Sequence, residues 1–391
     1  MAAALFAARA GAAVTLLERN EKLGRKLYIT GKGRCNVTNT AENLLDGIPH
    51  NPRFLHSAFA CLDSADLRAL LADNGCPTKE ERGGRVFPVS DKASDVTRAL
   101  ERALHGAGVN VCLNSRVASL EPLSDRGAVV LATGGVSYPA TGSTGDGYDL
   151  ARRAGHTLLP PRPSLIPIVT KEEWPRALQG LSLKNVRLSA LSGGRTRFDE
   201  LGEMLFTHFG VSGPLVLSMS SHILDETPES LTVRIDMKPG LTDEQLDRRV
   251  LRDVADAPRK QLRSLLAGLV PARMADILPE LCGLPGEKAA GAITREERAR
   301  LCALLKGIPL TIAGLRPIAE AIVTRGGVDV REVDPRTMMS KRRAGLFFAG
   351  ELIDVDAHTG GYNLQIAFST GALAGKSAAA WDGNMEQTGG K

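Results

Sequence analysis

Three stretches of the chain combine glycine with hydroxyl, amide and basic side chains, which suits them to binding a nucleotide. They cover residues 30–39, 133–147 and 350–365. Glycine lets the backbone approach a ligand closely, and lysine, arginine, threonine and asparagine in the first stretch add positive charge and hydrogen bonds. Taken alone, residues 30–39 fit a solvated surface loop equally well.

A carboxylate that could hold a ribose stands near the start of the chain. Residues 2–10 are rich in helix formers and end at Gly11, and the apolar run 12–17 then ends in Glu18. The order helix, glycine, buried parallel strand and acid is typical of the second half of a βαβ dinucleotide-binding unit, in which the acid accepts hydrogen bonds from ribose hydroxyls. The strand and G-x-G-x-x-G loop of the first half are missing from the sequence. We expect Met1 to be an internal methionine of a longer protein.

Other segments must position these residues. The sequence predicts helices over residues 63–73, over 90–106 with Ser90 as N-cap, and over 364–380, and strands over 109–113, 128–131 and 346–348. The strands at 128–131 and 346–348 lead directly into the second and third glycine stretches. Ligands of parallel α/β sheets bind at such strand ends, and the start of the helix at residue 364 suits an anion.

The middle of the chain differs from its two ends in proline content and in hydrophobic pattern. Prolines at 160, 161, 163 and 167 predict a linker, after which short alternating segments up to residue 240 predict a β-barrel or sandwich. Residues from about 241 to 308 are helical in composition. The sequence again predicts strands near residues 310–312 and 320–324.

Bulk properties exclude several classes of protein. The net charge of +5 is spread over 391 residues without a run of five basic residues, so no nucleic-acid partner is expected. The chain has no apolar run of about 18 residues, which argues against a membrane span. The six cysteines form no Cys-x-x-Cys pair and no zinc-like spacing, so we expect no metal and a cytoplasmic location.

Four motifs in order resemble those of the BaiN/YhiN-like, or aminoacetone-oxidase-like, FAD-binding flavoproteins. They are residues 29–39, 132–147, 202–214 and 350–365. The resemblance implies an α/β fold with a glutathione-reductase-like, Rossmann-type FAD domain made of residues 1–163 and 331–391, apparently truncated at its N-terminus. An inserted domain over residues 164–330 would hold a β-barrel and a helical subdomain at about 241–308.

The resemblance also implies places along an extended FAD molecule. Glu18 would hold the adenosine ribose, residues 30–36 would flank the flavin ring, and residues 361–364 would approach the ring through the start of the last helix. The implied FAD-binding residues are Glu18, Arg25, Lys26, Thr30, Gly31, Gly33, Arg34, Asn36, Val117, Thr133, Gly134, Gly350, Glu351, Asp354, Gly361, Tyr362, Asn363 and Leu364.

We therefore expect an FAD-dependent oxidoreductase that transfers hydride to an unidentified small organic substrate, with NAD(P)H as a candidate donor. His208 and His358 are candidate proton donors, and Cys35 fits a packing role better than a redox role. Two alternatives stay open: a flavoprotein that modifies RNA, and a truncated remnant unable to bind FAD.

Overall fold

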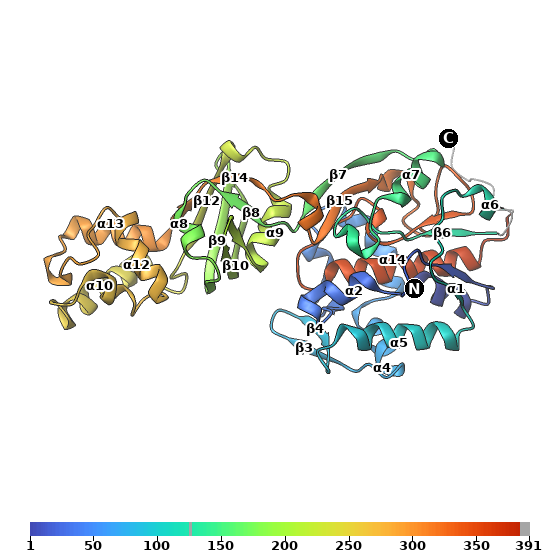
Figure 1. Ribbon diagram of the computed structural model, residues 1–391, viewed down its shortest axis with the longest axis horizontal. Helices are drawn as coiled ribbons and strands as arrows, with labels where there is room; N and C mark the ends of the chain where they lie inside the picture. Colours follow the sequence, from blue (N-terminus) through green and yellow to red (C-terminus); the bar gives the residue numbers. More distant parts are fainter. Residues whose placement is uncertain (125–126, 384–391) are drawn as a thin grey trace. The chain divides into compact units, whose positions relative to one another are not determined.

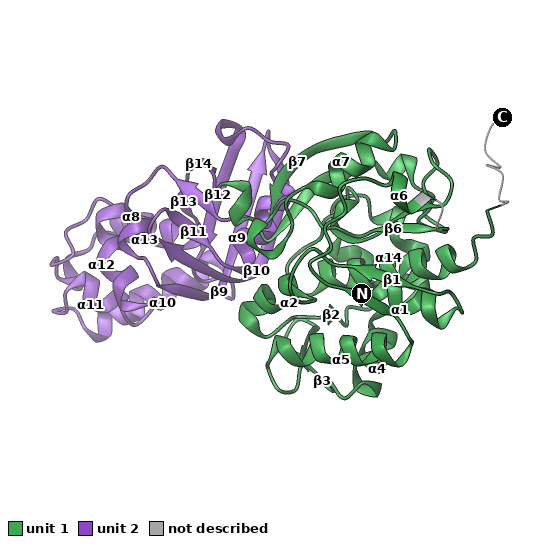
Figure 2. Cartoon of the chain, turned by 45° about the vertical axis from the view of Figure 1, so that its right-hand side comes forward, with its two compact units in different colours: residues 1–164, 317–391 green, residues 165–316 purple. Residues whose placement is uncertain are grey.

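The computed structural model describes residues 1–124 and 127–383, which form two compact units (Figures 1 and 2). Unit 1 combines residues 1–164 with the chain from Pro317 onward, and unit 2 is Leu165–Arg316. The sequence predicts the second boundary at residue 330 instead. It lies earlier because β15 (Val323–Val328) pairs with β7 (Leu158–Ser164) and so belongs to unit 1.

Unit 1 contains two short parallel strand pairs, which are the part of it that resembles a Rossmann-type sheet. β1 (Thr15–Leu17) pairs with β5 (Asn110–Cys112), and β6 (Val129–Leu131) pairs with β16 (Leu346–Phe348). In a parallel pair the carboxyl ends meet at the same edge. The chain segments that leave β6 and β16 are therefore neighbours, although more than 200 residues of sequence separate them.

The two ends of unit 1 are joined by a close helix pair. α1 (Ala2–Arg9) lies along α14 (Tyr362–Ala379), as the blue and red helices of Figure 1 show. Small residues permit this approach, because a Cβ at Gly375 would lie 2.2 Å from the carbonyl oxygen of Ala3. The predicted last helix, over residues 364–380, is thus confirmed with a start two residues earlier.

The remaining helices and strands of unit 1 surround these pairs. They are α2 (Arg25–Ile29), β2 (Thr38–Asn39), α3 (His56–Cys61), α4 (Ser64–Asp73), β3 (Thr78–Glu81), β4 (Arg85–Pro88), α5 (Ala93–Gly106), α6 (Glu121–Ser124) and α7 (Asp146–Arg153). Strands β2, β4 and β3 form an antiparallel sheet in that order.

Three local predictions for unit 1 are wrong. β1 is not buried, because Thr15 and Leu17 are exposed on one face of its ladder. Ser90 is not an N-cap: α5 begins at Ala93, and the Ser90 hydroxyl instead accepts a hydrogen bond from the amide of Lys92. The proline-rich segment is strand β7 rather than a linker, since proline tolerates an extended strand that pairs on one side.

Unit 2 contains one antiparallel sheet of seven strands. Its order is β13 (Ile308–Leu310), β12 (Leu231–Asp236), β9 (Ser182–Ser192), β10 (Arg195–Thr207), β11 (Gly210–Ser212), β8 (Ile168–Thr170) and β14 (Ile312–Leu315). The first and last strands of this order, β13 and β14, are separated in the chain only by Thr311, so the sheet curls round until its two edges meet there, as in the predicted β-barrel.

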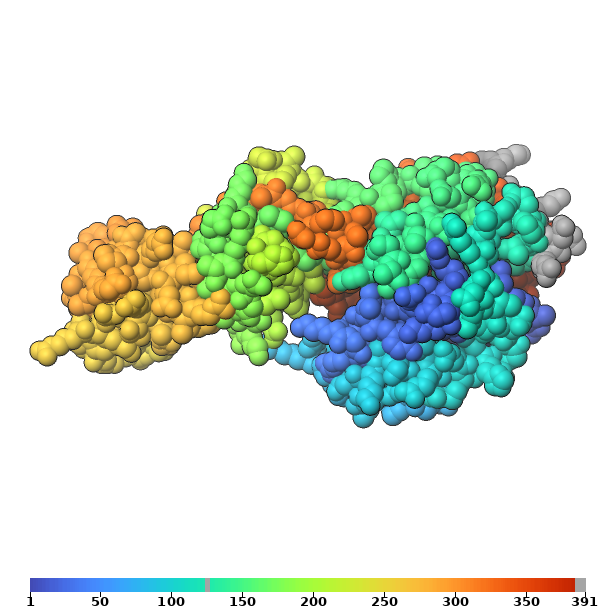
Figure 3. Space-filling view, in the orientation of Figure 1, coloured from blue at the N-terminus to red at the C-terminus, as the bar shows by residue number. Residues whose placement is uncertain are grey.

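Helices complete unit 2. They are α8 (Trp174–Ala177), α9 (Pro214–His222), α10 (Asp243–Asp256), α11 (Leu262–Leu266), α12 (Ala272–Leu281) and α13 (Arg295–Lys306). Figure 1 labels α10, α12 and α13 in yellow to orange, and the residues of the same range form the yellow-to-orange part of Figure 3. Thr242 and Thr294 cap α10 and α13 through capping boxes, and both helices lie within the range 241–308 whose composition predicts helix. Within residues 1–124 and 127–383, no helix has the length and apolar character of a membrane span.

Candidate functional site

The ends of β6 and β16 meet at a carboxylate, Glu351. Its Oε1 accepts hydrogen bonds from the Ser137 hydroxyl and the Thr324 amide, each at 2.8 Å. Its Oε2 forms an ion pair with Lys26, whose Nζ also donates to the Ser137 hydroxyl at 2.9 Å. The structure therefore brings together Lys26 and Glu351, two of the predicted cofactor-binding residues, from opposite ends of the chain.

Glycines allow the close packing around these strand ends. Gly350 follows β16 with φ 71°, a left-handed conformation that glycine adopts readily. After β6, Gly134 has φ 76°, and a Cβ on Gly147 would lie 1.8 Å from the Thr133 hydroxyl. The predicted residues Thr133, Gly134 and Gly350 thus lie at one edge of the β6–β16 ladder.

The start of α14 is held tightly against the chain near residue 38. Gly361 is its N-cap with φ 102°, and a Cβ there would lie 2.2 Å from the Thr38 carbonyl oxygen. The Asn363 side chain donates to the carbonyl of Ala357 at 2.8 Å and accepts from its amide at 3.0 Å. This arrangement fixes a helix N-terminus whose amides suit an anionic or carbonyl oxygen.

Two predicted residues of α14 have packing contacts. A Cβ on Gly47 would lie 2.5 Å from the Tyr362 ring, so that ring packs against the backbone of residue 47. Leu364 is partly buried against the core that α1, α4 and α5 share. Their contact with FAD stays a prediction.

The glycine loop at residues 30–36 has an unusual backbone. Gly31, Lys32, Gly33 and Cys35 all have φ between 57° and 84°. Left-handed non-glycine residues such as Lys32 and Cys35 are uncommon and often mark functional segments. The predicted residue Thr30 closes the loop, because its carbonyl accepts from the Cys35 amide at 3.0 Å.

Side chains of the same loop fasten it to the β3–β4 hairpin. The Asn36 side chain accepts a hydrogen bond from the Val86 amide at 3.1 Å. The Arg34 guanidinium pairs with Glu81 and Asp91 and lies 4.0 Å from the Phe87 ring centroid. Arg34 therefore anchors the loop, and its contact with FAD stays a prediction.

Cys35 has the packing role that the sequence favours. Its side chain is fully buried, and burial raises the pKa of its thiol to about 12. A thiol in that state has almost no thiolate at neutral pH and is a poor nucleophile.

Glu18 lies where the sequence places it, at the end of β1. Its backbone bonds to Cys112 and Ser115, and its Oε1 accepts two hydrogen bonds from Asn20, each at 2.8 Å. Arg25 donates to Asn20 at 3.3 Å, and Val117 is partly buried in a separate hydrophobic cluster. The roles of Glu18, Arg25 and Val117 toward FAD stay predictions.

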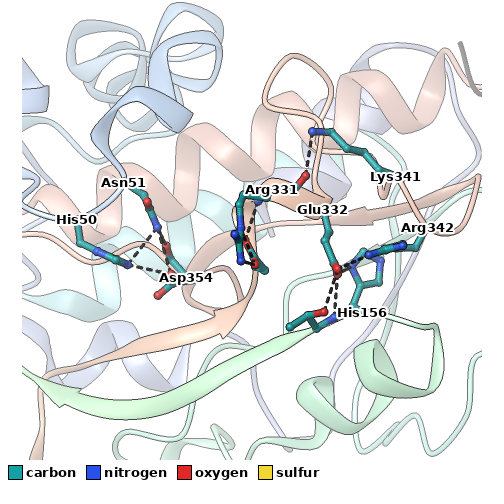
Figure 4. Close-up of polar contacts among 10 residues, drawn as sticks. His50, Asn51, His156, Arg331, Glu332, Lys341, Arg342 and Asp354 are labelled. Carbon is teal, nitrogen blue, oxygen red and sulfur yellow. Dashed lines mark hydrogen bonds and ion pairs between the residues drawn. The ribbon is translucent and has the colours of Figure 1, made fainter. Parts of the chain in front are cut away.

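His50, which no pattern in the sequence marks, is hydrogen-bonded to the predicted residue Asp354 (Figure 4). His50 Nε2 lies 2.8 Å from Asp354 Oδ2, and the Asn51 side chain donates to the same oxygen at 3.1 Å. The Gly326 amide donates to Oδ1 at 2.8 Å. Asp354 is 2% exposed, which leaves little of its carboxylate for a direct contact with a ligand.

The two histidines singled out from the sequence lie in different units. His208 is exposed at the turn between β10 and β11, with its ring 4.9 Å from that of Phe209. His358 is partly buried, and its amide donates to the Gly47 carbonyl at 2.8 Å. Their catalytic roles stay predictions.

Two further features bear on the chemistry. Across the described residues no group of three or more His, Cys, Asp or Glu side chains could hold a metal ion. A cavity of about 440 Å³ opens between residues 40–45 and helices α3 and α4. None of the predicted site residues lines it.

The sequence matches the profile of a known family, described as HI0933-like protein Rossmann domain, over residues 1–377. The chain belongs to the HI0933-like family. Members share a Rossmann-type FAD-binding fold and are FAD-dependent oxidoreductases. The donor set of unit 1 fits that cofactor, since glycine-rich strand ends, a helix N-terminus and the Lys26 ammonium are groups that bind phosphate and flavin oxygens.

Named relatives of this HI0933-like chain align over nearly its whole length. It is 34% identical to the 3-dehydro-bile acid delta(4,6)-reductase of Clostridium scindens, covering 96% of both chains. It is 31% identical to the ribosomal RNA dihydrouridine synthase of Haemophilus influenzae, covering 94% of both. A solved 3-ketosteroid-delta4-(5alpha)-dehydrogenase from Rhodococcus jostii RHA1 superposes with a TM-score of 0.46 at 15% identity, covering 97% of this chain and 94% of that one.

Proposed function

We propose that this protein is an FAD-dependent reductase that saturates a carbon–carbon double bond conjugated to a carbonyl group in a small organic molecule. We further propose that NAD(P)H supplies the electrons and that the cofactor is bound by the glycine loop at residues 30–36, the ends of β6 and β16 with Lys26, and the N-terminus of α14. Bound FAD accepts a hydride from one partner and delivers it to another. The observation that carries the proposal is the 34% identity, over 96% of both chains, to a relative named as a reductase of such bonds.

The names of the relatives agree in their chemistry. A 3-dehydro-bile acid with delta(4,6) double bonds has a ketone conjugated to the bonds that are reduced. Formation of dihydrouridine from uridine also reduces a ring double bond conjugated to a carbonyl group. A common active-site chemistry can therefore serve both, with different surroundings selecting the substrate.

The chain would contribute binding, orientation and a proton. Lys26 and the N-terminus of α14 would face negative oxygens of the cofactor, because Lys26 has a positive charge and the helix N-terminus has a partial positive charge. The left-handed loop around Gly31 and Gly33, fixed by Arg34 and Asn36, would present its backbone to the flavin ring without rearranging.

Anaerobic flavin spectroscopy tests this proposal. The purified protein, supplied with FAD, should show a flavin spectrum that NADH or NADPH bleaches. Addition of a 3-oxo-4-ene steroid or 2-cyclohexen-1-one should then restore the oxidised spectrum. A protein that takes up FAD but is reoxidised by neither probe contradicts the substrate class, and one that takes up no FAD contradicts the proposal as a whole.

A second candidate function is reduction of uridine in RNA. It rests on the two relatives named as ribosomal RNA dihydrouridine synthases, from Haemophilus influenzae and Escherichia coli, each 31% identical over more than 90% of the chain. Binding of ribosomal RNA whose affinity falls steeply with salt, together with dihydrouridine in the recovered RNA, would favour it over the small-molecule reductase. Reoxidation by the enone probes in the absence of any effect of RNA would count against it.

A further inference from the structure

We propose that His50 and Asp354 form a proton-carrying pair, in which the His50 imidazole takes up a proton when FAD is reduced and gives it to the substrate. The inference rests on the proposed function and deepens it. Reduction of a conjugated double bond needs a hydride and a proton, and the hydride comes from the cofactor. The proton needs a group of the protein that lies near the surface and is held in one orientation.

His50 meets both requirements. Its Nε2 lies 2.8 Å from Asp354 Oδ2, while its side chain keeps 33% of its surface exposed. We assign the ring hydrogen to Nε2, because the Asp354 carboxylate beside it can only accept and because the Asn51 Nδ2, 3.1 Å from Nε2, donates to Asp354. Nδ1 is then the nitrogen that gains and loses the proton. The pair thus connects a buried acid to an imidazole that solvent can reach.

The carboxylate is fixed before any ligand binds. Asn51, in a left-handed conformation with φ 55°, donates from its side chain to the Asp354 carbonyl at 2.7 Å and to Oδ2 at 3.1 Å. The Gly326 amide holds Oδ1 at 2.8 Å. Both oxygens of the carboxylate are thus held in place, and the carboxylate in turn orients the imidazole.

The position of His50 ties it to the third glycine stretch. A β-bridge pairs His50 with Asp356, and the Gly47 carbonyl accepts from the His358 amide at 2.8 Å. The Tyr362 ring at the start of α14 packs on Gly47. Residues 47–50 therefore run alongside the segment that leads from the end of β16 to the N-terminus of α14.

The other charges around the pair are compensated. Asp356 forms an ion pair with Arg325 at 2.8 Å, and both side chains are at most 9% exposed. Glu351 is paired with Lys26. Tyr148 is a neutral phenol, because burial and the carboxylates of Glu351 and Asp354 raise its pKa. Asp354 is therefore the carboxylate that acts directly on the imidazole.

The proton and electron count is balanced. FAD bound here would take a hydride from NAD(P)H and later supply it to the substrate, and His50 would take up one solvent proton to compensate the added negative charge. The double bond then receives the hydride at the carbon β to the carbonyl and the His50 proton at the α carbon. The carbon–carbon π bond breaks, two carbon–hydrogen bonds form, and His50 and FAD return to their starting states.

The pH dependence of the midpoint potential of bound FAD tests the pair without any substrate. A two-electron reduction that takes up one proton shifts by about 30 mV per pH unit, and one that takes up two shifts by about 60 mV. We expect the steeper slope for the wild type across an interval near neutral pH. His50→Gln should show about 30 mV per pH unit throughout. Asp354→Asn should move the steep interval to lower pH.

His105→Gln is the matched control, because His105 is an exposed histidine in the last turn of α5. It should keep the wild-type slope. Two results overturn the proton-carrying pair and leave the proposed function intact. One is a wild-type midpoint potential that changes by about 30 mV per pH unit at every pH, and the other is a steeper change that survives in His50→Gln. A steep slope lost in His50→Gln, with no reoxidation by the enone probes, supports the pair and contradicts the proposed function. Failure of the wild type to bind FAD overturns both.

Discussion

Lys26 and Glu351, 325 positions apart in the sequence, form an ion pair that joins α2 to the end of β16. Glu351 also accepts from Ser137 and Thr324, so one carboxylate connects four segments of unit 1. The side chains of Lys26 and Glu351 are 25% and 16% exposed. The pair is thus shielded from solvent more than an ordinary surface ion pair.

Replacing Lys26 with methionine should lower the free energy of unfolding by about 2 kcal/mol, because Glu351 loses its counter-ion in a partly buried place. Urea denaturation measures the change. Arg98→Met is the control, since Arg98 pairs with Asp95 on the surface with 59% of its side chain exposed. That change should cost less than about 0.5 kcal/mol. Equal losses in the two variants would argue against a structural role for the Lys26 pair.

Gly361→Ala should destabilise the protein by more than about 3 kcal/mol, because the new Cβ meets a backbone oxygen and φ is positive. The clash distance to the Thr38 oxygen is 2.2 Å. Gly155→Ala separates the two causes, since Gly155 has φ 89° but no atom within 4 Å of the added Cβ. We expect a loss of about 1 kcal/mol there. A similar loss at both positions would mean that the contact with Thr38 is relieved by small shifts.

Cys35 should resist alkylation by iodoacetamide in the folded protein. Burial raises its thiol pKa from 9.0 to about 12, which reduces the thiolate at a given pH roughly a thousandfold. The partly exposed Cys61 and Cys112 provide the comparison within the same chain. Peptide mass spectrometry should find them labelled first, and Cys35 only after denaturant is added. Early labelling of Cys35 would disprove the packing role.

As the pH is lowered below about 6.5, the free energy of unfolding should decrease, partly because His156 becomes protonated more readily in the unfolded chain. This histidine is 3% exposed, and burial lowers its pKa although Glu332 opposes the shift (Figure 4). Because its folded pKa is depressed, the unfolded chain binds the proton first, so stability is full above the unfolded pKa and is lost as pH falls below it.

His156→Gln tests this assignment, because glutamine keeps a partner for the Ser340 hydroxyl, which lies 2.7 Å from His156 Nε2. Urea denaturation at pH 7.5 and 5.5 should show a smaller loss of stability on acidification in the variant than in the wild type. Equal pH dependence in both would assign the loss to other groups.

Much of the local structure could be predicted, and for identifiable reasons. Helices α4 and α13 have their own N-caps, Asp63 and Thr294, in the sequence. Both helices have capping boxes, so residues of the helix itself determine where it begins. Helix α12 lies within the range 241–308 that the composition predicts as helical, but its end could not be placed, because Pro279 inside it usually signals a break.

The parts of the site that could be predicted are those in which glycine residues set the backbone conformation. Glycine spacing located the loop at residue 31 and the start of α14. The partner of Asp354 could not be foreseen, because His50 is 304 positions away and no local pattern marks it. Arg34 was expected to face a ligand, and its pairing with Glu81 and Asp91 depends on a hairpin that forms some 50 residues later.

The way the chain enters and leaves unit 2 makes residues 165–316 an exchangeable cassette. In unit 1, Ser164 pairs with Val323, and in unit 2, Ile168 pairs with Leu315. Both units thus hold the two crossing segments side by side, so the insertion closes a loop whose ends are already adjacent, and its length adds little entropic cost. Replacing the whole segment at that point would leave unchanged the register of the β6–β16 ladder that leads to Glu351, because that ladder involves no residue of unit 2.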